Sequence, residues 1–544
     1  MKITAGVAVV AAVVTAALGV AEGQGPLVEV SGGLLRGQTT TKHNITYLEF
    51  LSVPFATPPI GSLRFKDPLP AEPWEGELDA TNMPPLCDQA TVVGDEDCLY
   101  LNIYTPEYAL ETPSPLPIMV FIHGGGYFAL GSDVYRGFQE FVARDIIVVV
   151  IQYRLGIFGF LSTEDDAATG NQGLKDQTLA LQWVQDNIAA FGGDPARVTL
   201  FGESAGSSSI SLQMLVPSAA GLFSGAIMES GTALNPWAMG RQFLEMAQEI
   251  AERFDCPTLP TDELVTCLQG VRAHILDSYY LSTSEWNLQP FYLAPRVDGE
   301  YLPDEPATLM LEGRFHHVPV IMGVNRDEMG MQTVEMFARP NLIDDLVGNF
   351  SVNGPASLHL HPDEDPINTT LTVYNHYLGG VDIVKENVDN MTLMYTEAIF
   401  HVHFDWAVQL LSSSNVVYKY ELHHRGEYSL VNVFLNAGLD LPEGYNYVSH
   451  TDEMQYYMYP RYANLNTTED QILGQHIPAL WANFAQTGNP TPDDSLGFTW
   501  EMTEPTMLSH LKILPEPFME TDQRAEARAF WESLPLRINN LLNH

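Results

Sequence analysis

The sequence predicts an α/β fold in which a large, mostly parallel central sheet is covered by helices on both faces. Apolar strands alternate with helices along the chain, and most of the apolar runs are continuous, which is typical of strands buried on both faces. The expected strands are PIMVFIHGGG, DIIVVVIQYR, RVTLFG, FSGAIMES, VPVIMGVN, VVYKYEL and HLKIL. Continuous strands connected by helices are the pattern of a parallel sheet.

Two helices are clear from the sequence. The stretch NQGLKDQTLALQWVQDNIAAFGG has an amphipathic period, and Gly192 closes it; its apolar face is Leu174, Leu181, Trp183, Val184 and Ile188. The stretch AGSSSISLQMLV directly follows a strand. Residues 340–400 are more polar and helical, and we expect them to be a helical cap insertion rather than a separate domain.

The charge balance excludes several classes of partner. The chain has 544 residues and a formal net charge of −43, with 45% apolar residues. Nucleic-acid binding needs clustered Lys and Arg, so we expect no nucleic-acid partner, and anionic membranes are equally unfavourable. The apolar fraction is high enough for a large core, so the charge indicates a solvated surface rather than disorder.

The N-terminus resembles a secretory signal peptide. Lys2 is followed by an apolar run to Val20, and small residues then offer cleavage positions around 21–25. A signal anchor is the alternative, because the run approaches the length that spans a bilayer. We expect a signal peptide at 1–23, a single domain at 24–544 and secretion, with no membrane span in the mature chain; the oligomeric state is left open.

Cysteines and glycosylation sequons agree with an oxidising compartment. The four cysteines form two close pairs in sequence, and we expect two local disulfides, Cys87 with Cys98 and Cys256 with Cys267. Five Asn-X-Ser/Thr sequons are candidate glycosylation sites: Asn44, Asn349, Asn368, Asn390 and Asn466.

The most informative motif is Gly-Glu-Ser-Ala-Gly at residues 202–206. It stands between an expected strand and an expected helix, where a sharp turn would lift the Ser204 hydroxyl above the sheet. A serine hydroxyl is a weak nucleophile until a base takes its proton. A second motif, His123 followed by three glycines, ends another strand and offers backbone N–H groups to an oxyanion. Together the two motifs predict nucleophilic catalysis.

These and further motifs resemble the type-B carboxylesterase family, the cholinesterase-like branch of the α/β-hydrolases. The resemblance spans about residues 26–535 and includes arthropod enzymes of the juvenile-hormone-esterase type. Besides the two motifs above, it is carried by EDCLYLN (96–102), YRLGIFGFL (153–161), NQGLKDQ (171–177), FGGDP (191–195) and WANFA (481–485). It implies an α/β-hydrolase fold and hydrolysis of carboxylic esters through an acyl-enzyme, with no cofactor.

The resemblance also assigns the remaining site residues. Glu328, in Asn-Arg-Asp-Glu after a strand, matches the family's catalytic acid, and His450 matches its catalytic histidine. The order Ser204, Glu328, His450 is the one this fold requires. The N–H groups of Gly125, Gly126 and Ala205 match the oxyanion hole. The resemblance further implies two buried ion pairs, Arg64 with Glu96 and Arg154 with Asp176.

This chain departs from the family at two positions near the expected triad. Met329 stands where the family usually has glycine after the acid, and Tyr447 stands where it usually has glycine three residues before the histidine. Both substitutions introduce side chains near the triad, where we expect them to affect substrate access.

Two other functions are compatible with the resemblance. A hormone esterase of the juvenile-hormone or methyl-farnesoate type would fit Arg64-Phe65 and Asp176-Gln177, although such enzymes usually have Gln where Glu203 stands. A non-catalytic adhesion protein of the same fold would usually lack the serine and carry a C-terminal membrane span. This chain keeps all three triad residues, so we expect an enzyme.

The expected substrate is a neutral ester. Recognition of a quaternary ammonium rests on an aromatic face, and residues 88–97, inside the first expected disulfide loop, contain no aromatic residue. Trp237, Phe291 and Tyr292 match the wall of the acyl pocket. The paired histidines, such as His401 and His403, lack a third ligand at fixed spacing, so we expect no metal site.

Overall fold

The described part of this computed structural model comprises residues 25–90, 92–135, 137–280, 283–432, 446–458 and 465–543. The expected signal peptide at 1–23 lies outside these residues. Within them, an 11-stranded sheet has the strand order β14-β13-β12-β11-β10-β9-β7-β8-β6-β4-β3. The strands are β3 (Gln38–Lys42), β4 (Ile45–Pro54), β6 (Tyr100–Pro106), β7 (Leu116–Ile122), β8 (Ile147–Ile151), β9 (Gly193–Glu203), β10 (Gly225–Glu229), β11 (Val320–Asn325), β12 (Val417–Leu422), β13 (His510–Ile513) and β14 (Phe518–Glu520).

The centre of this sheet is parallel, as the sequence predicts. Strands β8, β7, β9, β10, β11, β12 and β13 pair in parallel with their neighbours. The outer strands β3, β4 and β6 on one side and β14 on the other pair antiparallel. A second small sheet joins β1 (Leu27–Val30), β2 (Gly33–Arg36) and β5 (Glu77–Asp79). The sequence analysis predicted neither the antiparallel outer strands of the large sheet nor the strands of the small sheet.

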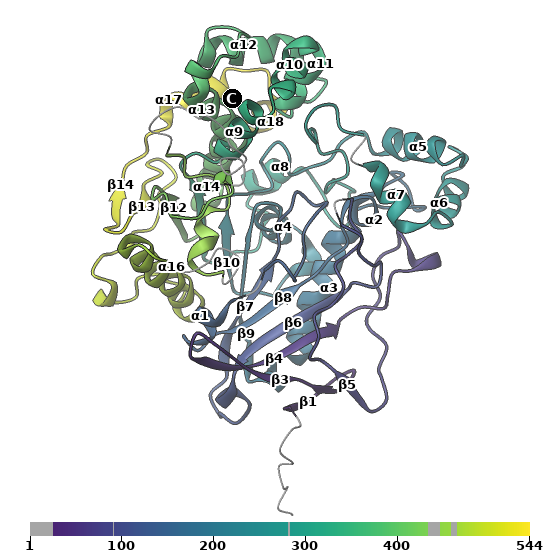
Figure 1. Cartoon of the computed structure of the whole chain (residues 1–544), viewed down its shortest axis with the longest axis vertical. Helices are drawn as coiled ribbons and strands as arrows, with labels where there is room; N and C mark the ends of the chain where they lie inside the picture. The colour runs from purple at the N-terminus through teal and green to yellow at the C-terminus, as the bar shows by residue number, and fades with distance from the viewer. Residues whose placement is uncertain are drawn as a thin grey trace, which may run out of the picture.

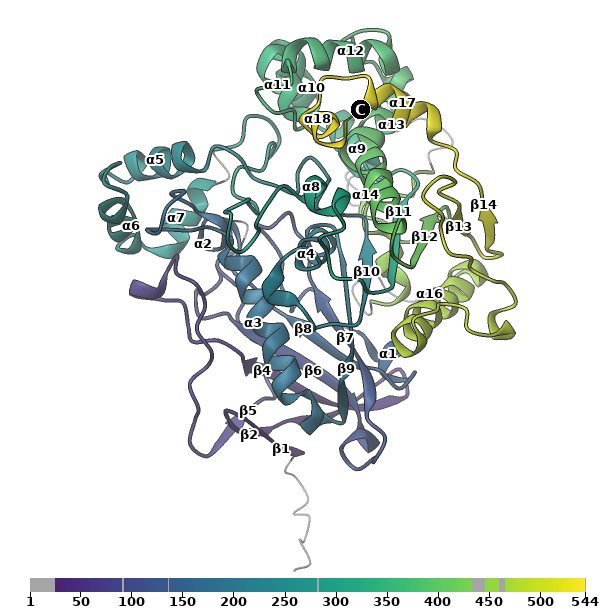
Figure 2. The ribbon, with the colours of Figure 1, turned by 180° about the vertical axis from the view of Figure 1, so that it is seen from behind.

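Both faces of the parallel strands are buried. On β7, Ile118, Val120 and Ile122 belong to one hydrophobic cluster, and Met119 and Phe121 belong to another. Because successive side chains of a strand point to opposite faces, the two clusters are the two sides of one sheet. Helices α3 and α4 cover the first face (Figure 2), and α1 and α16 cover the second. This double burial explains the continuous apolar runs.

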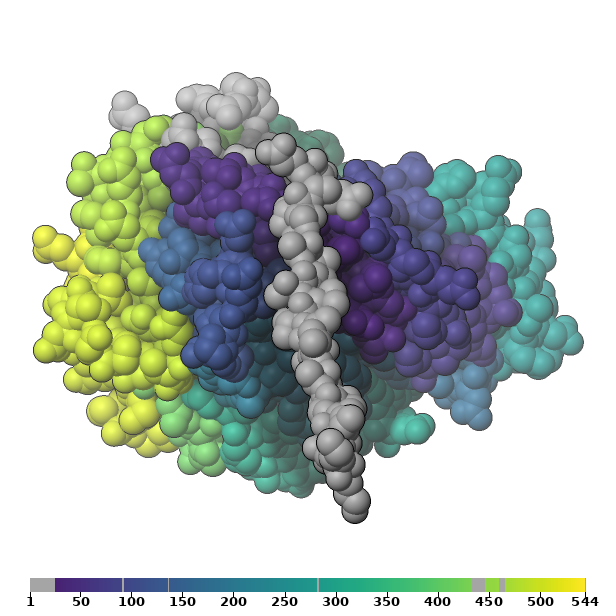
Figure 3. All heavy atoms as spheres, turned by 90° about the horizontal axis from the view of Figure 1, so that it is seen from below, coloured from purple at the N-terminus to yellow at the C-terminus, as the bar shows by residue number. Residues whose placement is uncertain are grey.

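The helices are α1 (Gln139–Val142), α2 (Gly156–Phe160), α3 (Gln172–Asn187), α4 (Ala205–Gln213), α5 (Phe243–Arg253), α6 (Thr261–Gln269), α7 (Ala273–Tyr280), α8 (Pro306–Leu311), α9 (Gly330–Ala338), α10 (Pro340–Gly348), α11 (Phe350–Ser357), α12 (Pro366–Leu378), α13 (Val388–Thr396), α14 (Val402–Ser412), α16 (Thr468–Thr487), α17 (Ala525–Glu532) and α18 (Arg537–Leu542). Helices α10–α13 form the expected insertion and gather at one end of the molecule, at the top of Figure 1. Helices α5–α7 form a separate lateral group. Seen from the opposite end, the C-terminal part of the surface lies on one side, and N-terminal segments extend from next to it across to the other side (Figure 3).

Both expected disulfides are present, and each closes a loop near the carboxyl end of the sheet. Cys87 bonds Cys98, and Cys256 bonds Cys267. The five sequon asparagines are all exposed, as glycosylation would require. In the described part of the chain, no helix is both long and apolar enough to cross a membrane.

Two ion pairs tie distant segments together; Arg154–Asp176 is fully buried, whereas Glu96 of the other pair is 13% exposed. Arg64 bonds Glu96 through Nε at 2.6 Å and through Nη2 at 2.5 Å. Arg154 bonds Asp176 through Nη2 at 2.7 Å and Nε at 2.8 Å, and these side chains are 3% and 0% exposed. Each guanidinium therefore makes two parallel hydrogen bonds, the strongest geometry for such a pair.

The Asp176→Asn substitution should lower the free energy of unfolding by about 3–5 kcal/mol, because it leaves the buried Arg154 guanidinium without a counter-charge. Urea denaturation followed by circular dichroism measures the change. The matched control is Asp194→Asn, which removes the partly exposed pair with Arg197 and should cost about 0–1 kcal/mol. Equal losses in the two variants would contradict a special role for the buried pair.

Candidate active site

Ser204 occupies a strained turn between β9 and α4. Its backbone has φ 59° and ψ −123°, a conformation that L-residues rarely adopt. The flanking glycines are required by close packing. A Cβ atom on Gly206 would lie 1.9 Å from the carbonyl oxygen of Ile122, and one on Gly202 would lie 2.4 Å from the same oxygen. The turn therefore presses against the last residue of β7, where the glycine run begins.

The glycine run passes close to Ser204. A Cβ atom on Gly124 would be 3.1 Å from the Cβ atom of Ser204. Gly125 and Gly126 have φ values of 101° and 61°, which favour glycine. In the described residues, the N–H groups of Gly125, Gly126 and Ala205 donate no hydrogen bond. Three free donors beside one hydroxyl can receive an oxyanion.

His123, at the start of the glycine run, is held by packing and hydrogen bonding. It is fully buried, its ring stacks on Tyr153 at 4.4 Å, and the Tyr153 hydroxyl donates to the His123 carbonyl at 2.8 Å. Burial lowers the pKa of His123 to about 4, so the ring is neutral. Its role is to hold the glycine run in place.

Glu328 and His450 meet although 122 residues separate them. His450 Nδ1 is 2.7 Å from Glu328 Oε2. The other carboxylate oxygen accepts hydrogen bonds from the Ser230 hydroxyl at 2.6 Å and from the Asn325 N–H at 2.7 Å. These donors fix the carboxylate, and the carboxylate in turn fixes the tautomer and orientation of the imidazole, as a catalytic acid must.

The second ring nitrogen of His450 faces Glu203, the residue before Ser204. The sequence analysis assigned Glu203 no role in the site. His450 Nε2 lies 2.9 Å from Glu203 Oε1. In this part of the structure no hydrogen bond joins the Ser204 hydroxyl to His450, and catalytic hydrogen bonds commonly tighten only when substrate binds. Burial alone would lower the pKa of His450, but the nearby charges of Glu203 and Glu328 raise it well above its ordinary value.

Two further buried acids complete a cluster behind the histidine. Glu229 is the register partner of Glu203 across β9 and β10, and it accepts hydrogen bonds from Tyr457 and Trp481. Burial raises the pKa of Glu229 to about 8, and burial together with the other acids raises that of Glu453 well above the usual range. Burial therefore favours the protonated form of both carboxyls. The sequence analysis missed Glu229; the one feature that could have indicated it is an acidic residue at the end of an apolar strand.

The three expected pocket residues do not share one environment. Trp237 packs at 5.7 Å against Phe400, whose ring is 4.7 Å from His450. Phe291 reaches the glycine run, because a Cβ atom on Gly126 would be 3.2 Å from Phe291 Cζ. Tyr292 instead donates from its hydroxyl to Glu285 and lies under Arg241.

The two residues that depart from the family pattern are also buried. Met329 and Tyr447 are 8% and 7% exposed. The Tyr447 hydroxyl donates to Asp389 on α13, so this side chain reaches the cap insertion. The Tyr447 hydroxyl therefore bonds the cap insertion and takes no part in the Glu328–His450 hydrogen bond.

The described residues contain no cluster of three or more His, Cys, Asp or Glu side chains arranged to hold a metal ion. The histidine pair singled out in the sequence is buried. His401 hydrogen-bonds the Asn325 carbonyl at 2.8 Å, and burial lowers the pKa of His403 to about 3. Both rings are part of the packing of α14 and the turn before it.

The parallel sheet, the strained serine between a strand and a helix, and the acid–histidine pair at the carboxyl edge together define an α/β-hydrolase. Residues 24–531 match the Carboxylesterase family, and the chain belongs to that family. A juvenile hormone esterase of Tribolium castaneum is 33% identical over 90% of this chain and 88% of its own length. A cocaine esterase of Oryctolagus cuniculus is 35% identical over 90% and 92%. Esterase E4 of Myzus persicae is 33% identical over 86% and 88%. The protein is a carboxylic-ester hydrolase.

The pH dependence of kcat/KM for a neutral ester should reveal the charge of Glu203. A histidine acts as a base only when neutral. The raised pKa of His450 keeps the ring protonated to higher pH, so with His450 as the base, activity should fall as pH drops through that pKa. Glu203→Gln removes one of the charges that raise the pKa and should move the inflection to lower pH.

The matched control is Glu245→Gln, an exposed position on α5, which should leave the profile unchanged. An inflection that stays in place or moves upward in Glu203→Gln would show that Glu203 does not act on the imidazole.

Proposed function

We propose that this protein is a secreted serine carboxylesterase that hydrolyses neutral esters through an acyl-enzyme intermediate. The observation that carries the proposal is the Glu328–His450 hydrogen bond of 2.7 Å at the carboxyl edge of the sheet, beside a serine in a strained strand-to-helix turn. Ser204 is the nucleophile, His450 the general base and Glu328 the residue that orients it.

The proposed reaction has two similar halves. Above the pKa of His450, the neutral ring keeps its proton on Nδ1 toward Glu328. Its unprotonated Nε2 leaves Glu203 and accepts the proton of the Ser204 hydroxyl as the oxygen attacks the ester carbonyl. The N–H groups of Gly125, Gly126 and Ala205 stabilise the oxyanion. His450 then gives the proton to the departing alcohol. Water repeats the attack on the acyl-enzyme, with His450 again acting as base, and the acid is released.

Secretion is supported by separate features. The N-terminal apolar run, the two disulfides and the five exposed sequon asparagines all fit an oxidising compartment. We propose that the run is removed as a signal peptide and that the sequons carry sugar.

A hormone esterase is the second candidate. The Tribolium relative is named for juvenile hormone, and Arg64-Phe65 and Asp176-Gln177 fit that group. Other relatives are named for cocaine, acylcarnitine and pyrethroids, so names alone support no single ester. A terpenoid methyl ester assayed beside short and long p-nitrophenyl esters tests this candidate.

Ser204→Ala should abolish the burst and the steady-state turnover of p-nitrophenyl butyrate, because no acyl-enzyme can form. Stopped-flow absorbance measures both phases, and thermal melting checks the fold. Ser218→Ala, at an exposed serine, is the matched control and should keep full activity. A burst that persists in Ser204→Ala would assign the nucleophile elsewhere.

Choline esters should not be preferred, because the Cys87–Cys98 loop offers no aromatic face to a quaternary ammonium. The ratio of kcat/KM for acetylthiocholine to that for its neutral 3,3-dimethylbutyl thioester analogue should stay below about tenfold, which is about 1.4 kcal/mol of transition-state binding. A larger ratio would reveal a cation site.

A further inference from the structure

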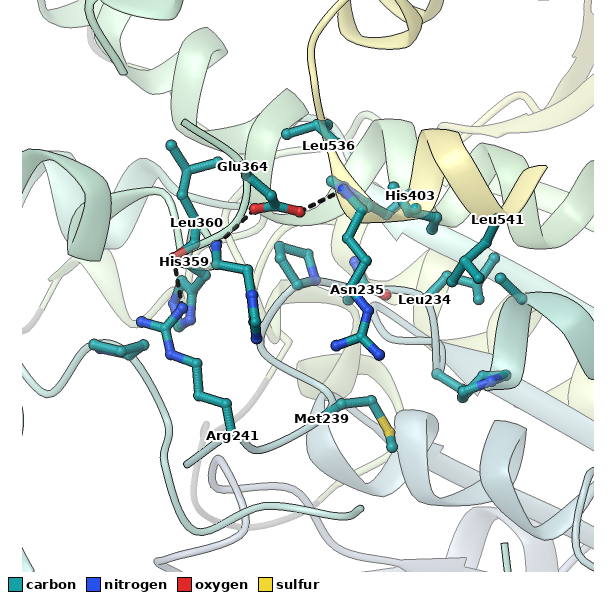
Figure 4. A pocket seen from close by; sticks show the side chains of 18 of the residues that line it. Leu234, Asn235, Met239, Arg241, His359, Leu360, Glu364, His403, Leu536 and Leu541 are labelled. Atoms are coloured by element: carbon teal, nitrogen blue, oxygen red, sulfur yellow. Dashed lines mark hydrogen bonds between the residues drawn. The ribbon is translucent and has the colours of Figure 1, made fainter. Parts of the chain in front are cut away.

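A separate cavity lies on the far side of the proposed acyl wall. Its volume is about 160 Å³. Side chains reach it from the segment after β10, the segment before α5, the turn after α11, α14 and the C-terminal α18 (Figure 4). Leu234, Met239, Leu360 and Leu541 give it an apolar lining. Segments that are far apart in sequence thus meet around one half-open cavity.

One aromatic ring stands between this cavity and the oxyanion glycines. Phe291 lines the cavity. On one side, its Cζ atom is 3.2 Å from the position of a Cβ atom on Gly126. On the other side, its ring meets the ring of His359 edge to face at 5.4 Å. A chain extending from an ester at Ser204 toward the cavity would therefore pass Phe291.

Two buried imidazoles in the lining have an unsatisfied nitrogen. His359 and His403 are 6% and 5% exposed, and among the described residues the Nδ1 atom of each has no hydrogen-bond partner. Burial lowers the pKa of each to about 3, so both rings are neutral. His359 also has a left-handed backbone, with φ 56°. Buried polar atoms without partners are rare in proteins and require an explanation.

Arg241 is the unbalanced charge of this cavity. Its Nη1 atom donates to the Leu360 carbonyl, and its guanidinium carbon lies 5.6 Å over the ring of Tyr292. Its Nε atom is buried without a hydrogen-bond partner, and within the described residues Arg241 forms no ion pair. Arg241 is partly buried, so water reaches part of its guanidinium, but the buried Nε atom lacks an acceptor that a ligand could supply.

The acids that line the cavity are already satisfied. Glu305 pairs with Arg537. Glu364 accepts hydrogen bonds from the backbone N–H groups of His361 at 2.6 Å and Arg537 at 2.7 Å. The nearby Glu285 accepts from Tyr292, which separates it from Arg241. The cavity therefore presents an apolar wall, one free cation and two neutral polar nitrogens.

We propose that this cavity receives the distal end of the substrate's acyl group and binds a carboxylate there through Arg241. Besides neutral esters, half-esters of dicarboxylic acids are then substrates, with their ester group at Ser204, a chain that passes Phe291 and a carboxylate at Arg241. The proposal rests on the proposed function, because it places the ester carbonyl at Ser204.

The test compares 4-nitrophenyl hydrogen octanedioate, which ends in a carboxylate, with 4-nitrophenyl methyl octanedioate, which ends in a neutral ester. We expect kcat/KM to favour the carboxylate by about tenfold or more, the size expected of one charged contact. Arg241→Met should abolish this preference, and Arg241→Lys should retain part of it. Arg253→Met, an exposed arginine on α5, should leave it intact.

A binding measurement separates this proposal from the catalytic one. In Ser204→Ala, calorimetry with the carboxylate-ended ester should show binding that Arg241→Met weakens about tenfold. If no ester is turned over but this binding persists, the catalytic assignment fails and the cavity assignment stands. If the preference and the binding are unchanged in Arg241→Met, the cavity assignment is overturned.

Free octanoate distinguishes an acyl-end pocket from an independent acid site. Competition with the carboxylate-ended ester, lost in Arg241→Met, supports the acyl-end pocket. Binding that depends on Arg241 but leaves the turnover of both esters unchanged would overturn it, because the cavity would then hold a separate acid.

Discussion

The contact between the serine turn and the end of β7 positions the proposed catalytic groups relative to one another. Gly206 approaches the Ile122 carbonyl so closely that any side chain would collide with it. This approach sets the Ser204 turn beside the glycine run that continues from β7. Parallel strands bring their carboxyl ends to one edge, so Glu328 after β11 and Ser230 after β10 lie at the same edge. The active-site geometry follows from the packing of the sheet.

The acids at the carboxyl edge of the sheet have different surroundings. Glu328 receives two hydrogen bonds besides its contact with His450, and these hydrogen bonds hold the carboxylate in place beside the imidazole. Glu229 and Glu453 lie behind it, where burial favours their neutral forms. Glu203 stands between these groups, next to His450 Nε2. The free enzyme therefore holds its base against an acid that must be exchanged for the serine hydroxyl, which couples activity to pH.

Specificity is distributed over different parts of the chain. The loop closed by Cys87 and Cys98 lacks an aromatic platform, and the glycine run meets Phe291 directly. Behind Phe291, the cap insertion and the C-terminal helix line a half-open cavity that contains Arg241. The proposed chemistry and the proposed selection of the acyl group thus belong to separate layers, the sheet edge and the helices above it.

The local patterns of the sequence determined the parallel core, helix α3, the cap insertion and Ser204. Buried parallel strands need continuous apolar runs, and a strained turn needs glycines at fixed spacing, so both leave local signatures. Glu328 and His450 had no such signature and were recognised only through family resemblance. The antiparallel outer strands and α5–α7 were not predicted, because short strands at sheet edges carry weaker patterns. Only the tertiary structure decided that Glu203 faces His450 and that Arg241 lines a cavity without a counter-ion, because burial and the pairing of charges depend on which segments meet in space.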